Sequence, residues 1–85
     1  MKVTFVSSNI EKEVDDVVSI DFVGDNGKFR ILDNHDSLIS LLAKGDFNYV
    51  TKNGKKVNFN VVSGLINVEK NNVKVVLTEY SGDIA

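Results

Sequence analysis

The sequence predicts an all-β fold, an antiparallel β-sandwich or flattened barrel, formed by one domain that spans residues 1–85. Three observations predict it: apolar and polar residues alternate with a period of two, Asn-Gly and Asn-Asn turn signals separate these segments, and proline is absent. Such alternation is typical of antiparallel strands that bury one face and expose the other. The fold class therefore follows from the spacing of side chains along the whole chain.

The first clear strand signals flank the pair Asn26-Gly27. Ile20 and Phe22 alternate with polar residues before this pair, and Phe29 and Ile31 do so after it. Asparagine and glycine adopt positive φ at low cost, as two-residue hairpin turns of type I′ require. We therefore expect a hairpin in which Asn26 and Gly27 form a tight turn.

Residues 37–44 fit two patterns. Four apolar residues in this segment would form one stripe of a helix, whereas Leu38, Ser40 and Leu42 would share one face of a strand. Because about eight residues between turn signals are few for a helix, we expect this segment to be extended.

The second half of the chain repeats the strand pattern around Asn53-Gly54 and Asn71-Asn72. Apolar residues alternate with polar ones in residues 46–49, 57–61 and 73–77. Many short strands at regular turn spacing favour a sandwich or a flattened barrel.

Composition and charge exclude several classes of protein. The formal net charge of −2 argues against a generic nucleic-acid-binding protein, and the one basic cluster, Lys52–Lys56, flanks a predicted hairpin turn, where lysines protect solubility. No apolar run approaches the ~20 residues of a membrane helix, and the N-terminus becomes polar too soon for a secretory signal. Without cysteine, disulfides and thiolate zinc sites are excluded. We expect a soluble intracellular domain.

No recognisable active site emerges from the residues. His35 is the only histidine, and its loop aspartates do not provide the three or four ligands of a metal site. A calcium loop that began at Asp33 would need glutamate at its twelfth position, which is Lys44. Ser63-Gly64 lacks the preceding glycine of a nucleophile elbow. A hydrolase would need a serine or a second carboxylate within about 3 Å of the imidazole; we expect no catalytic residue, metal or cofactor.

From Gly24 to His35 the sequence resembles the N-terminal β-sandwich domain of the epsilon subunit of F-type ATP synthase, which is called delta in mitochondria. The family has Glu-Glu-Gly-Glu-Phe-Gly-Val-Leu-Pro-Gly-His-Ala-Pro-Leu-Leu-Thr here, and seven residues fall in register without gaps: Gly24, Gly27, Phe29, Leu32, His35, Leu38 and Ser40. Further similarities to the family lie at Leu42–Gly45, Val62–Val68 and Asn72–Glu79. The resemblance runs from about Val3 to Glu79, nearly the whole chain.

The resemblance implies a sandwich of about ten strands that acts as a non-catalytic subunit of the central rotor stalk. Its partners would be the gamma subunit and the membrane-embedded c-ring, which it would couple during ATP synthesis driven by protons or sodium ions. It would be peripheral to the cytoplasmic face of the bacterial inner membrane. No cofactor, nucleic acid or small-molecule substrate is implied. The alternative is an unrelated small β-sandwich that binds another protein; an exposed apolar patch on one sheet favours the rotor interpretation.

Carried over by position, the resemblance assigns two sets of contact residues. The expected c-ring contact is Asp25, Asn26, Gly27, Lys28, Asn34 and His35, and the expected gamma contact is Ser8, His35 and Ser40. Lys28 stands where the family usually has a carboxylate, which reverses the charge at the expected c-ring contact.

Two further departures from the family concern the chain's turns and its end. Both prolines of the family's turn are absent from Leu32–Ser37, so we expect this turn to be more flexible, with Asn34 taking the positive φ of the family's glycine. Typical members continue into a C-terminal helical hairpin that regulates ATP hydrolysis. The 85 residues lack it, so we expect no helix-based inhibition from them.

Overall fold

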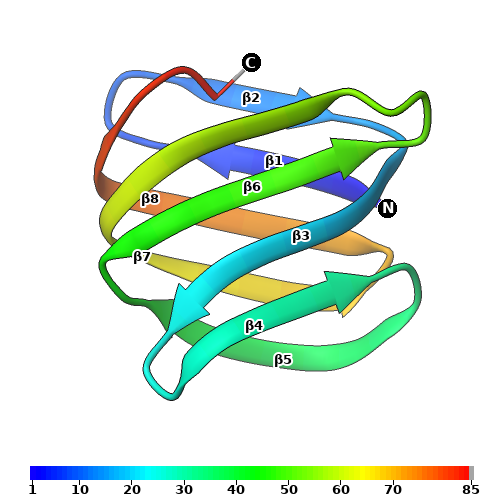
Figure 1. The fold of residues 1–85 in the computed structure, drawn as a ribbon, viewed down its shortest axis with the longest axis horizontal. Helices are drawn as coiled ribbons and strands as arrows, with labels where there is room; N and C mark the ends of the chain where they lie inside the picture. The colour runs from blue at the N-terminus through cyan, green and yellow to red at the C-terminus, as the bar shows by residue number, and fades with distance from the viewer. Residues whose placement is uncertain (85) are drawn as a thin grey trace.

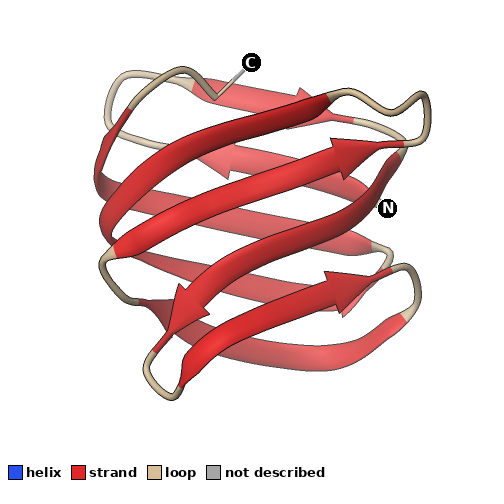
Figure 2. Cartoon of the chain, viewed as in Figure 1, coloured by secondary structure: helices blue, strands red, loops and turns tan. Residues whose placement is uncertain are grey.

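The computed structural model describes residues 1–84. This part of the chain folds into eight β-strands joined by turns and contains no helix (Figure 1, Figure 2). The strands are β1 (Lys2–Val6), β2 (Glu11–Val14), β3 (Val17–Gly24), β4 (Gly27–Leu32), β5 (His35–Leu42), β6 (Gly45–Thr51), β7 (Lys56–Lys70) and β8 (Asn72–Ser81). The all-β prediction is confirmed. The ambiguous segment is β5, so the prediction of an extended conformation there is confirmed as well.

The expected number of about ten strands was too high, and β7 explains part of the difference. Alternation predicted a strand over residues 57–61, and the chain continues from it through residues 62–68 as one strand of 15 residues. Ser63 and Gly64 lie within it, and there the pairing register with β8 shifts, so the strand bends without ending.

The strands form two layers that share β7. The front layer in Figure 1 has the order β4, β3, β6 and the first half of β7, and the back layer has the order β2, β1, β8, the second half of β7 and β5. Seven of the eight strand pairings are antiparallel, whereas β1 and β8 pair in parallel. The expectation of purely antiparallel strands was therefore wrong for this pair. The first and last strands of the domain meet there with no hairpin between them to impose an antiparallel direction.

The turns differ from the expected type I′ geometry. The tight two-residue turn lies at Asp25 and Asn26, between the paired residues Gly24 and Gly27, and is thus displaced by one residue from the expected Asn26-Gly27. Only Gly27 has a positive φ there (108°). A type I′ turn needs positive φ at both central residues, so neither this turn nor the one at Asn53-Gly54, where only Gly54 has positive φ, is of that type.

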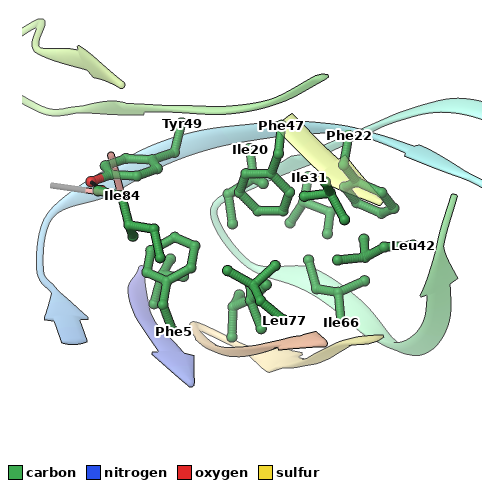
Figure 3. Packing of buried hydrophobic residues seen from close by; sticks show 14 of the residues in the cluster. Phe5, Ile20, Phe22, Ile31, Leu42, Phe47, Tyr49, Ile66, Leu77 and Ile84 are labelled. Atoms are coloured by element: carbon green, nitrogen blue, oxygen red, sulfur yellow. Dashed lines mark hydrogen bonds between the residues drawn. The ribbon is translucent and has the colours of Figure 1, made fainter. Parts of the chain in front are cut away.

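An aromatic cluster fills the space between the layers (Figure 3). Phe47 lies near its centre, with ring centroids 4.9 Å from Phe59 and 5.9 Å from Phe5. These rings come from β6, β7 and β1, so both layers contribute to the same core. The period-two alternation of the sequence places them there, because their polar neighbours lie on the outer faces.

Candidate partner-binding surface

A row of apolar side chains crosses the outer face of the back layer. Strand register places Leu41 of β5 opposite Leu65 of β7, Leu65 opposite Val76 of β8, and Val76 opposite Val6 of β1. We call these four residues the apolar rung. They point outward because their neighbours on the strands, among them Leu42, Ile66, Val75 and Phe5, are buried in the core.

The rung is most exposed at its β5 end. Leu41 has 57% of its surface exposed, and Ile39, on the same face of β5, has 69% exposed. Both residues border a hollow of about 560 Å³ that lies between β5 and the β3–β4 hairpin. An apolar row that continues into a hollow is typical of a surface that another protein covers.

Sequence reasoning did not identify the rung, although a signal for it existed. Each of its members follows or precedes a buried apolar residue, as in Leu41-Leu42, Leu65-Ile66 and Val75-Val76. Only one face of a strand packs in the core of a sandwich, so apolar residues on both faces indicate that the outer face is apolar as well. That the four outward residues line up depends on register, which the sequence does not display.

The structure places the expected c-ring residues in two groups. Asp25, Asn26, Gly27 and Lys28 are exposed at the β3–β4 hairpin, whereas Asn34 lies in the turn at the other end of β4 and His35 begins β5 directly after it (Figure 1). A strand of this length holds its ends roughly 20 Å apart. The two groups therefore do not form one compact contact point.

Charges near the hairpin are unevenly paired. Arg30 donates two hydrogen bonds to the carboxylate of Asp21, 2.6 and 3.1 Å long, from the neighbouring strand β3. This hydrogen bonding lowers the pKa of Asp21 and raises that of Arg30. Lys28 is exposed opposite Val23 and forms no salt bridge with any residue in 1–84. Its ammonium group is thus available to a partner.

The β4–β5 turn is tied to two other segments despite the missing prolines. Asn34 adopts the expected positive φ (61°). Its backbone N–H donates to Oδ1 of Asn71 at 2.9 Å, and Nδ2 of Asn71 donates to Oδ1 of Asn34 at 2.9 Å. The α-amino group of Met1 donates to Oδ1 of Asp33 at 2.8 Å. These bonds provide restraint that proline would otherwise supply.

The expected gamma-contact residues are distributed around the rung. Ser8 is exposed in the loop after β1, two residues beyond Val6. Ser40 precedes Leu41, but its side chain lies on the inner side of β5, where its hydroxyl donates to the Leu41 carbonyl at 3.0 Å. Ser8 and Ser40 therefore flank opposite ends of the rung, and His35 lies at the far end of β5.

The imidazole of His35, at the start of β5, packs against its neighbours. Its Nδ1 is 2.8 Å from the backbone carbonyl of Asp36, and its ring packs edge-on against Phe29, with centroids 5.7 Å apart. Within residues 1–84 no three histidine, aspartate or glutamate side chains are grouped so as to hold a metal ion. In the same residues no helix is long and apolar enough to cross a membrane.

The fold and this surface define a small two-layered β-sandwich domain with one apolar outer row. The family model of the ATP synthase delta/epsilon chain β-sandwich domain matches residues 1–80, and the chain belongs to this family.

Two curated relatives are named ATP synthase epsilon chain. The one from Protochlamydia amoebophila is 32% identical over 68 residues, which are 78% of this chain and 46% of the relative. The one from a Nitratiruptor species is 39% identical over 56 residues, which are 66% of this chain and 43% of the relative. The chain thus spans somewhat under half the length of these relatives.

Solved structures show the same fold. A chain in the central stalk and c-ring of the mitochondrial ATP synthase of Tetrahymena thermophila superposes with a TM-score of 0.80 at 16% identity, covering 94% of this chain and 64% of that one. A chain in the OSCP/F1/c-ring structure of the Euglena gracilis mitochondrial ATP synthase gives 0.81 at 19% identity, covering 93% and 51%. At these identities the likeness concerns the fold alone.

Proposed function

We propose that this chain acts as the epsilon-type subunit of the central stalk of F-type ATP synthase, joining the gamma subunit to the membrane-embedded c-ring. In this role it breaks no bonds; it transmits rotation by fitting between two neighbours. The observation that carries the proposal is the apolar rung, exposed at Leu41 and half-buried at its other three residues, on a sandwich that belongs to the delta/epsilon family. As part of that complex it lies at the cytoplasmic face of the bacterial inner membrane.

The rung and its surroundings support the assignment of the gamma contact. Four adjacent strands at about 4.8 Å spacing make the row roughly 14 Å long. Stable interfaces bury about 800 Å² per partner and have an apolar centre with a polar rim. The rung can supply the apolar centre, and Ser8 lies beyond its β1 end, whereas the side chain of Ser40 lies on the inner side of β5. We place the gamma contact over the rung.

The β3–β4 hairpin is the proposed c-ring contact. Its tip is exposed, and Lys28 has no salt-bridge partner within residues 1–84. Because Asn34 and His35 lie at the opposite end of β4, we assign the direct contact to Asp25, Asn26, Gly27 and Lys28 and leave Asn34 and His35 as secondary candidates.

The test is capture of the complex from detergent-solubilised membranes of the source cells with the tagged chain, followed by detection of gamma and c. The double variant Ile39→Asp, Leu41→Asp should lose gamma, because two carboxylates are placed on exposed apolar positions. Asn58→Asp is the matched control, because Asn58 is exposed on the outer face of the other layer. Lys28→Glu should change recovery of c while the circular dichroism spectrum stays that of the parent.

Failure of the parent chain to recover either subunit would overturn the proposal in favour of an unrelated protein-binding module. Equal recovery of gamma by the rung variant and by Asn58→Asp would reject the rung as the gamma contact. Unfolding of Lys28→Glu would mean that this side chain has a structural role and would reject it as a contact residue.

A further inference from the structure

We propose that residues 82–84 form a latch, which closes one end of the sandwich and opens while the two layers stay folded. The latch follows β8 directly and crosses the side of the molecule that β2 borders in the back layer and the first half of β7 borders in the front layer (Figure 1). The inference concerns this chain's own segments and does not depend on the identity of any stalk partner.

The contacts between Ile84 and Tyr49 hold the latch closed. The side chain of Ile84 is only 3% exposed and is part of the hydrophobic core, where it lies beside the rings of Tyr49 and Phe5 (Figure 3). The Tyr49 hydroxyl donates a buried hydrogen bond of 2.6 Å to the backbone carbonyl of Ile84. One apolar contact and one polar contact thus hold the same residue.

Gly82 gives the latch a defined path. Its φ is 105°, a conformation that residues with a Cβ rarely adopt. A Cβ at this position would also lie 3.0 Å from Cβ of Phe59 and 3.4 Å from its Cα. The chain can therefore turn closely over Phe59 to bring Ile84 to Tyr49 only because this residue is glycine.

Opening of the latch is separable from unfolding of the sheets. β8 ends at Ser81, and residues 82–84 take part in no strand pairing. Segments outside the strand pairing can open locally at a free energy below that of global unfolding. While closed, the latch holds residue 84, and any segment joined to it, against this end of the sandwich; when open, it exposes the rings of Tyr49 and Phe5.

NMR relaxation dispersion of the backbone nitrogens of residues 82–84 in the 85-residue chain tests the proposal through Tyr49→Phe, which removes one hydroxyl and keeps the ring. The population of the open state should rise about tenfold, the factor expected for loss of one buried hydrogen bond. Residues of the second half of β7 should show no such rise.

Tyr80→Phe is the matched control, because Tyr80 packs near the same end against Phe59, with centroids 6.2 Å apart, and its hydroxyl forms no hydrogen bond with residues 1–84. It should leave the open population of residues 82–84 unchanged. The second variant, Ile84→Ala, should raise that population by more than Tyr49→Phe does. A parent-like open population in both latch variants, or an equal rise across all strands, would overturn the proposal.

Discussion

Asn71 holds the turn that lacks the family's prolines, and its replacement by alanine should destabilise the domain measurably. The side chain of Asn71 makes two hydrogen bonds with Asn34, one to the backbone N–H and one from the amide to Oδ1. Both are 2.9 Å long and connect residues 37 positions apart. Asn71→Ala removes both bonds and leaves the backbone carbonyl of Asn71, which accepts from the N–H of Lys2, in place.

The expected loss follows from the number and exposure of these bonds. Hydrogen bonds contribute about 0.5–1.5 kcal/mol each, and exposed ones lie at the lower end because water replaces the lost partner. We expect Asn71→Ala to lower the free energy of unfolding by about 1–2 kcal/mol. For a domain of this size, each 1 kcal/mol lowers Tm by about 4–8 °C.

Urea denaturation and a thermal scan followed by circular dichroism measure this change. Asn72→Ala is the control, since Asn72 is the next residue, is also exposed, and no hydrogen bond from its side chain is present in residues 1–84. The control should change stability by less than about 0.5 kcal/mol. If the two variants are equally stable, the side chain of Asn71 does not hold the turn and this reasoning is refuted.

Three further predictions concern the core and two titrating groups. Phe47→Ala should lower the free energy of unfolding by about 3–5 kcal/mol in urea titrations, because it empties the centre of the aromatic cluster; a loss no larger than that of Phe47→Leu would contradict this. The hydrogen bonds from Arg30 lower the pKa of Asp21, so the pair stabilises the fold at neutral pH and ceases to do so as pH falls through the lowered pKa. In urea titrations, Arg30→Gln should therefore lower the free energy of unfolding more at pH 7 than at about pH 2. An equal loss at the two pH values would contradict this. Burial raises the pKa of Tyr49, and Asp83 adds to the rise, so the free energy of unfolding should fall as pH increases above about 10. In alkaline denaturation curves the parent should lose more stability above this pH than Tyr49→Phe does. Identical curves for the two proteins would contradict the prediction.

Local periodicity predicted most of the residues that lie inside the sandwich. The alternating residues Ile20, Phe22, Phe47 and Phe59 are buried, and the ambiguous segment is the strand β5. Phe29 alternates in the same way but is 41% exposed, because the edge strand β4 is covered only in part. The positive φ of Asn34 was expected from the resemblance, because asparagine can take the conformation of the family's glycine. These features depend on near neighbours in the chain, so a sequence pattern carries them. The contact residues expected at the β3–β4 hairpin came from the resemblance and remain a proposal.

Tertiary structure decided what depends on residues far apart in the sequence. The parallel pairing of β1 with β8 and the alignment of Leu41, Leu65, Val76 and Val6 into one rung follow from strand register, which distant segments set together. The same holds for the hydrogen bonds between Asn34 and Asn71. Alternation tells which face of a strand each side chain takes, but it contains no information on which residue of another strand lies opposite, because every shift of register by two residues preserves the pattern.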